Sequence, residues 1–186
     1  MEYVSIMRAD AARNLDAVLE TGARLLAADS GTSITAIAAE AGVSRRLVHR
    51  RFASREALEE CVFQTKLEAI DAVLADARLD SAPVAVALHR FVEGIIAVVR
   101  RYPIGPEQMR GSAESYARMN GQQVRIAAFI RRAMDEGFIR SDLPDGMAMA
   151  LLHATIDLLA LQFPDDEPAC AADIAVDTLL KGLGRS

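Results

Sequence analysis

The chain has 186 residues, of which 52% are hydrophobic and 25% charged, and its formal net charge is −5 at pH 7. This is a globular composition, with material for one domain or for a small domain joined to a larger one. The negative net charge excludes attraction to nucleic acid through bulk charge, so such a partner requires a local cluster of cations. The N-terminus lacks the apolar core of a signal peptide, and the most apolar stretch, residues 146–163, is interrupted by polar side chains. We therefore expect a cytoplasmic protein.

The two cysteines, Cys61 and Cys170, lie far apart and outside any CxxC or Cys/His cluster. The sequence therefore predicts neither a disulfide framework nor a metal site, and we expect no cofactor. The simpler interpretation of the two cysteines is that both are buried or half-buried free thiols.

The first elements are three helices in close succession. An amphipathic stripe predicts a helix over residues 9–28, ended by a left-handed turn at Gly31. A short helix over residues 34–41 follows, Gly42 breaks it, and a second short helix covers residues 44–51. A long helix followed by two short ones with a glycine turn between them is the helix-turn-helix arrangement.

The rest of the chain is also helical in pattern, and Ala and Leu dominate it, which favours an all-α fold of about nine helices. We expect residues 1–58 to form a helix-turn-helix DNA-binding domain and residues 59–186 a helical ligand-binding and dimerisation domain. The later elements are helices over residues 55–77, 83–101, 124–136, 145–162 and 168–182, a break at 102–106, and a short helix with a bend within 107–121.

Neither half of the chain is basic overall, but residues 44–55 carry five Arg and no acidic residue. If Val48 points inward, Arg46, Leu47, His49 and Arg50 lie on the exposed side of the second short helix. Arg can bridge guanine O6 and N7, and Leu can contact a thymine methyl group, so this face suits a DNA major groove. The plainer alternative is a solvated surface face. Backbone phosphates can be contacted by Arg51, by His49 and by Arg55 at the start of the next helix. The DNA-binding candidates are Thr32, Ser33, Ser44, Arg45, Arg46, Leu47, His49, Arg50, Arg51 and Arg55.

The same segment resembles the TetR family of transcriptional regulators. The resemblance rests on Ile37-Ala38, on Ala41-Gly42-Val43-Ser44, and on Phe52, Ser54, Arg55, Glu56 and Leu58 at the family's spacing, within about residues 8–60. One position departs from the pattern: His49 stands where the family usually has Tyr. An imidazole can still donate to a phosphate, which leaves its exact contact open.

The resemblance implies a homodimer whose two recognition helices read a palindromic operator in double-stranded DNA. It also implies a C-terminal domain that binds a small-molecule inducer, two late helices that pair across the dimer, and most often repression, although activation stays open. Nothing in the sequence identifies the inducer.

An inducer pocket requires apolar walls with a few polar groups. Ordinary core packing is the alternative for each aromatic or Met candidate. His153 and Asp157 lie four residues apart, a spacing that allows their side chains to pair on one helix face. Such a pair can belong to the dimer interface or can contact the inducer. The candidates are His89, Phe91, Tyr102, Met109, Tyr116, Phe129 and His153.

The dimer surface is expected on residues 145–162 and 168–182, with Leu152 and Leu159 in the interface. Two rival functions remain. An enzyme is disfavoured because the chain has three His and no phosphate loop, GxSxG or metal-spaced cluster, so no catalytic residue is expected. A helical protein that binds DNA without sequence choice, or not at all, predicts affinity that depends on salt alone.

Overall fold

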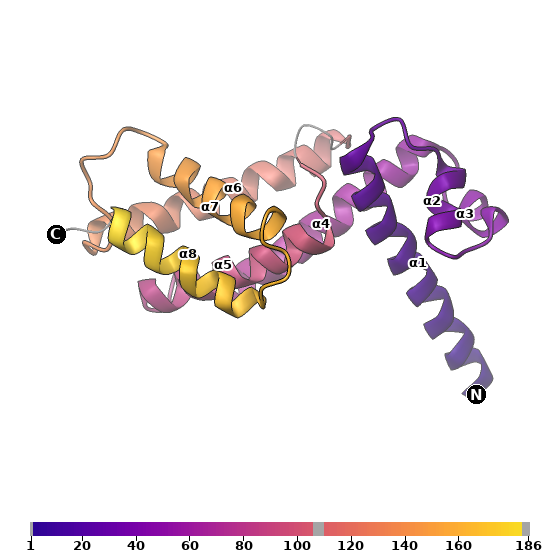
Figure 1. Ribbon diagram of the computed structural model, residues 1–186, viewed down its shortest axis with the longest axis horizontal. Coiled ribbons are helices and arrows are strands. Elements are labelled where there is room, and N and C mark those ends of the chain that lie inside the picture. Colours follow the sequence, from indigo (N-terminus) through magenta and orange to yellow (C-terminus); the bar gives the residue numbers. More distant parts are fainter. Residues whose placement is uncertain (1, 106–109, 184–186) are drawn as a thin grey trace. The chain divides into compact units, whose positions relative to one another are not determined.

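The computed structural model describes residues 2–105 and 110–183, and the side chains of residues 12–105 and 110–182. Within these residues the chain forms eight helices and no strand, which confirms the all-α prediction and is close to the nine helices expected (Figure 1). The helices are α1 (Glu2–Ala28), α2 (Ile34–Glu40), α3 (Arg45–Arg51), α4 (Arg55–Ala77), α5 (Val84–Arg101), α6 (Ala113–Asp135), α7 (Met147–Leu161) and α8 (Pro168–Leu183).

The chain divides into two compact units. The first comprises residues 1–66 with 101–115, and the second comprises residues 67–100 with 116–186. Helix α4 contributes residues to both units, because the division falls between Lys66 and Leu67.

The first unit holds α1, α2, α3 and the start of α4 around a small core. Each helix gives one apolar face to it, and α1 begins at Glu2 rather than near residue 9. The turn after α1 does not use a left-handed glycine, since Gly31 is not among the glycines with positive φ. Instead the Asp29 carboxylate accepts a hydrogen bond from Gly31 N at 2.7 Å. The core residues include Val18, Leu19, Ala23, Leu26, Ile37, Ala38, Val48, Phe52, Leu58, Val62 and Phe63.

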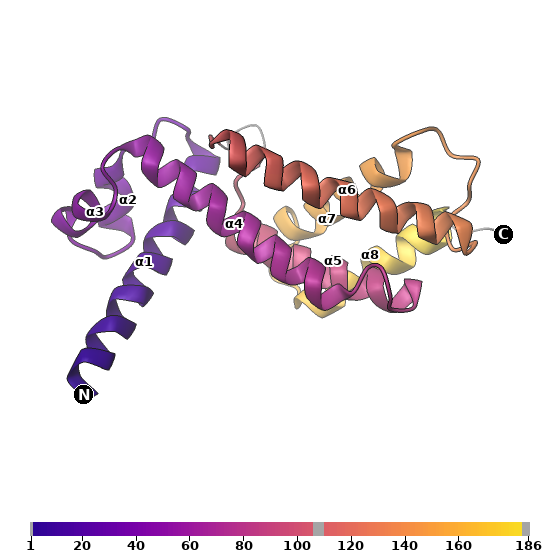
Figure 2. The same ribbon diagram turned by 180° about the vertical axis from the view of Figure 1, so that it is seen from behind.

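The second unit packs α5, α6, α7 and α8 with the end of α4 around a larger apolar core. Figure 2 shows α6 alongside α4 within this unit, and hydrogen bonds join them: Arg118 Nε donates to Asp71 Oδ2 at 2.7 Å. Helix α5 approaches α4 closely at Gly94, where an added Cβ would lie 2.6 Å from Val73 Cγ1. The absence of a side chain at Gly94 thus sets the separation of these two helices.

Helix α6 is where the structure departs most from the sequence prediction. We expected a short helix and a bend before residue 121, but α6 runs unbroken from Ala113 to Asp135 and includes Gly121. Gln122 anchors it: its Nε2 donates to Leu67 O at 2.9 Å and to Asp71 Oδ1 at 2.8 Å. These bonds come from α4, about fifty residues earlier, and they offset the low helix propensity of glycine.

Candidate nucleic-acid interface

The turn between α2 and α3 is defined by two serine caps and one glycine. Ser33 Oγ accepts from Ala36 N at 3.1 Å and Ser44 Oγ accepts from Leu47 N at 3.2 Å, so each short helix begins at a satisfied N-cap. Gly42 adopts φ +68°, a conformation that a residue with a side chain reaches only with strain. The sequence-based placement of Ser33, Gly42 and Ser44 in this turn therefore matches the structure.

Helix α3 is held by its apolar side and displays its basic side. Val48 is 0% exposed and Phe52, which ends the helix, is 4% exposed. Because these two anchors lie four residues apart on one face, the rest of the helix faces outward. The exposed cationic and imidazole side chains are those of Arg45, Arg46, His49, Arg50 and Arg51.

His49 is oriented by its neighbour one turn earlier. Arg45 Nε donates to His49 Nε2 at 3.2 Å. Nε2 is the acceptor in this contact, which leaves Nδ1 as the ring nitrogen that can donate elsewhere. Nδ1–H is thus the donor that His49 can offer to a phosphate.

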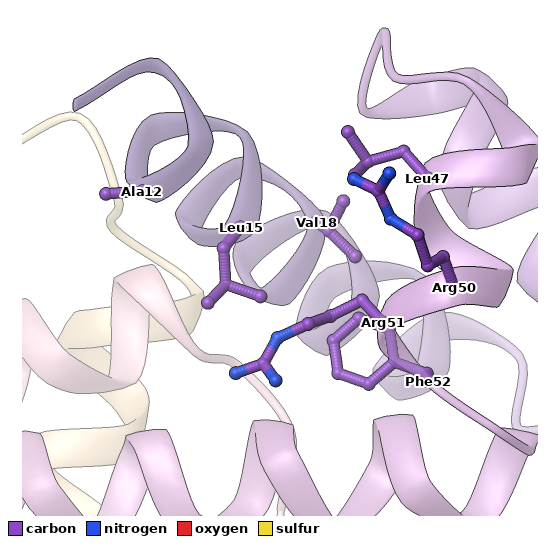
Figure 3. Close-up of a pocket in the computed structure, with 7 residues that line it drawn as sticks. All are labelled: Ala12, Leu15, Val18, Leu47, Arg50, Arg51 and Phe52. Carbon is purple, nitrogen blue, oxygen red and sulfur yellow. The ribbon is translucent and has the colours of Figure 1, made fainter. Parts of the chain in front are cut away.

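Leu47 differs from its predicted position. It is half-buried rather than fully exposed, and it lines a groove of about 330 Å³ between α1 and α3. Figure 3 shows Leu47 across this groove from Leu15 of α1, with the Arg50 side chain beside Leu47 and the Arg51 side chain extending below Leu15. The exposed face of α3 is therefore more cationic than the sequence indicated, since its one large apolar residue turns partly towards α1.

Arg55 also has partners that the sequence did not indicate. Its Nη1 donates to Thr32 O at 2.8 Å, its Nη2 donates to Ser30 O, and its Nε lies 2.6 Å from Glu59 Oε1. The side chain is 30% exposed. All three nitrogens of the guanidinium group bind within the protein, so Arg55 fastens the start of α4 to the turn after α1.

Thr32 takes part in the same turn. Its hydroxyl donates to Asp29 O at 2.9 Å, with a longer 3.4 Å contact to Leu25 O. Its own carbonyl oxygen accepts the hydrogen bond from Arg55 Nη1. Thr32 therefore closes the C-terminal end of α1, and Ser33 opens α2.

The start of α6 is joined to α4 in the first unit by hydrogen bonds to one carboxylate, that of Glu60. Glu60 accepts from Ser112 N at 2.7 Å, from Ser112 Oγ at 3.0 Å and from Ser115 Oγ at 2.6 Å. Burial alone would raise the pKa of Glu60, but these hydrogen bonds and one from Gln64 outweigh it and the pKa is lowered. No local pattern in the sequence indicates these hydrogen bonds, because the residues that they join lie some fifty positions apart.

The predicted inducer-pocket residues are not brought together. Phe91 and Phe129 are buried in the core of the second unit, whereas Tyr102 is buried in the first. Tyr116 is exposed, and Met109 lies outside the described residues.

The two histidines among the predicted pocket residues, His89 and His153, do not line the apolar cavity beside Phe129. His89 is half-buried and its Nε2 lies 2.9 Å from Asp173 Oδ1 of α8. His153 is half-buried and Asp157 exposed, and no hydrogen bond between them is found among the described residues. The internal cavity beside Phe129 is apolar and measures about 20 Å³. That is room for about one water, far below the roughly 300 Å³ of a small-molecule site.

The expected dimer residues need one correction. Leu152 and Leu159 are 4% and 7% exposed and belong to the core of the second unit, because they lie on the inner side of α7. The large apolar residues that α7 and α8 leave exposed are Met147, Leu158, Leu161 and Ile174, and Phe163 lies two residues after the end of α7. Cys170 of α8 is exposed as well, whereas Cys61 is half-buried as expected.

Two short helices at a glycine turn, with a cationic second helix, define a helix-turn-helix DNA-binding domain. Residues 18–60 match the family model described as "Bacterial regulatory proteins, tetR family". This match confirms, over residues 18–60, the resemblance predicted from the sequence.

Solved structures share the fold along nearly the whole chain. The TetR-like transcriptional regulator LfrR from Mycobacterium smegmatis, in complex with proflavine, is 22% identical with a TM-score of 0.67, over 94% of this chain and 99% of that one. The ketosteroid transcriptional regulator KstR2 of Mycobacterium tuberculosis is 16% identical with a TM-score of 0.72, over 91% of this chain and 94% of that one. No curated protein sequence matches the chain. In the part of the chain that the structure describes, every helix is too short or too polar to cross a membrane.

Proposed function

We propose that the protein is a sequence-specific transcriptional regulator of the cytoplasm that binds operator DNA through the exposed face of α3. The observation that carries the proposal is the pairing of a buried Val48 with an outer face of Arg and His and no acidic residue. Residues 1–58 supply DNA binding, and residues 59–186 supply ligand binding and dimerisation. Regulators of this family are transcription factors, and we assign this chain no catalytic role.

Within the α3 face we assign different tasks to different side chains. Arg46 and Arg50 are exposed, and we propose that they contact base edges in the major groove. Arg51, Arg45 and the Nδ1–H of His49 contact backbone phosphates, which position the helix without reading sequence. The turns that orient α3 for DNA are stabilised by the hydrogen bonds of Ser33, Ser44, Thr32 and Arg55.

We further propose a homodimer formed by α7 and α8, which leave Leu158, Leu161 and Ile174 exposed. A twofold dimer presents two α3 helices, so the operator is an inverted repeat. By analogy with the family, the protein represses its target and is released by a small molecule.

The DNA-binding proposal is tested by selecting bound duplexes from a random pool with the purified protein at near-physiological salt. We expect an inverted repeat. Recovery of no motif from a folded protein would instead support an architectural role, whose affinity depends on salt but not on sequence.

The dimer proposal is tested by sedimentation equilibrium of Leu158→Glu and Ile174→Glu, which we expect to be monomeric. Val124→Glu is the matched control, because Val124 is an apolar residue of the same unit, 69% exposed, but on α6. A dimer that survives both α7 and α8 substitutions, or one that Val124→Glu alone breaks, would place the interface elsewhere.

A further inference from the structure

A second groove lies in the second unit, between α6 and the segment that follows α4. It measures about 430 Å³ and is lined by Leu79, Asp80, Arg125, Ala128, Phe129 and Arg132. That volume falls within the range of small-molecule sites, unlike the cavity of about 20 Å³ inside the core.

The two arginines lie on one face of α6. They are seven residues apart, which is two helical turns or about 10 Å, so their long side chains can converge on one ligand group. Ala128 and Phe129 lie between them on the same helix, and Leu79 lies on the other wall. The groove thus combines cations with an apolar surface.

The arginines keep donors for a ligand. Arg125 makes a single described hydrogen bond, from Nη2 to Leu74 O, and it is long at 3.4 Å. Arg132 Nη2 donates to Ala82 O at 2.7 Å and its guanidinium lies 5.4 Å from the centre of the Phe129 ring. Its buried Nε makes no hydrogen bond among the described residues but forms an ion pair with Glu136 Oε1 at 3.5 Å, one turn further along α6. The bond to Ala82 and the Phe129 ring hold Arg132 in place, while its Nη1 has no described partner.

Asp80 limits the charge that the groove accepts. It is the one acidic residue of the lining, which therefore carries a single net positive charge, and Glu136, outside the lining, pairs with Arg132. A monoanion matches that charge, and a polyanion such as a nucleotide does not.

We propose that this groove binds an amphipathic organic monoanion, such as a medium-chain carboxylate. The carboxylate accepts hydrogen bonds from Arg125 and Arg132, and guanidinium groups suit a carboxylate because they donate in a planar fork. The hydrocarbon part covers Ala128 and Leu79.

The test uses the full chain without DNA, so that its result does not depend on operator recognition. Octanoate is titrated calorimetrically into the wild-type protein and into Arg125→Gln, with 1-octanol as the uncharged comparison. Arg131→Gln is the matched control, because Arg131 is an exposed arginine of α6 that does not line the groove. Circular dichroism checks that each variant keeps its helices.

We expect wild type and Arg131→Gln to bind octanoate alike and Arg125→Gln to bind at least about tenfold more weakly, as expected for loss of a charged hydrogen bond. We expect 1-octanol to bind more weakly than octanoate in the wild type. The proposal is overturned if octanoate fails to bind at concentrations up to about 10 mM. Equal affinities for the two arginine variants, or equal binding of octanol and octanoate, would also overturn it.

Discussion

Arg55 offers a sharp test, because the sequence and the structure assign it different roles. As a phosphate contact, its loss would weaken DNA binding and leave the fold intact. If Arg55 instead holds the start of α4 against the turn after α1, its loss removes the hydrogen bonds to Thr32 O, Ser30 O and Glu59 Oε1 and destabilises the fold. The structure favours the second role, because the guanidinium is already satisfied within the protein.

The size of the effect follows from those contacts. Hydrogen bonds to a charged group contribute about 1.5–3 kcal/mol each, but the side chain is 30% exposed and water replaces part of what is lost. We therefore expect Arg55→Ala to lower the free energy of unfolding by about 2–3 kcal/mol. For a chain of this size that corresponds to a fall in Tm of about 5–10 °C.

The assay is thermal unfolding followed by circular dichroism at 222 nm, beside the salt dependence of DNA affinity. Arg51→Ala is the control, because Arg51 is exposed and makes no described hydrogen bond or ion pair, and we expect its Tm to be unchanged. The reasoning is refuted if Arg55→Ala keeps the wild-type Tm while the slope of log K against log salt falls by about 0.9, the mark of one lost phosphate contact.

Three further substitutions test the hydrogen bonds and the packing. The lowered pKa of Glu60 means that its hydrogen bonds stabilise the fold above the ordinary value of 4.5 and lose that effect as pH falls through the lower folded value. We expect Glu60→Gln to lower Tm at pH 7 and the difference to shrink towards pH 3; a difference independent of pH would contradict this. Gly94→Ala places a Cβ 2.6 Å from Val73 Cγ1 and should destabilise by about 1–3 kcal/mol in chemical denaturation. Gly121→Ala, with nothing within 4 Å, should instead stabilise by up to about 1 kcal/mol; the same sign for both glycine variants would count against the packing described.

The sequence predicted best what local signals determine. The two caps at Ser33 and Ser44, the turn at Gly42 and the inward side of Val48 each depend on residues within a few positions, and the structure has them as predicted. The helix-turn-helix and its family resemblance followed from these features.

What the sequence missed depends on partners far along the chain. Arg55 donates hydrogen bonds to the backbone carbonyls of Thr32 and Ser30, which lie 23 and 25 positions earlier in the chain. The continuity of α6 depends on Gln122 binding α4. A helical wheel of α3 alone also could not place Leu47, because it is α1 that covers one side of that residue.

The ligand candidates show the same limit. Each aromatic residue fits a pocket wall or a core equally well by pattern, and packing decides between them. Phe91 is buried in the core, and Phe129 is buried there but also lines the larger groove. Arg125 and Arg132, which line the same groove, look like ordinary surface charges in the sequence.

In the function proposed above, α3 reads base sequence through Arg46 and Arg50. The most direct measurement compares wild type and Arg50→Ala on the selected operator and on operators with single base-pair changes, at one salt concentration. We expect Arg50→Ala to lose about 1–3 kcal/mol of discrimination at one position in each half-site while other positions keep theirs. A uniform loss of affinity on all sequences, with discrimination intact at every position, would contradict the claim and reduce Arg50 to a phosphate contact.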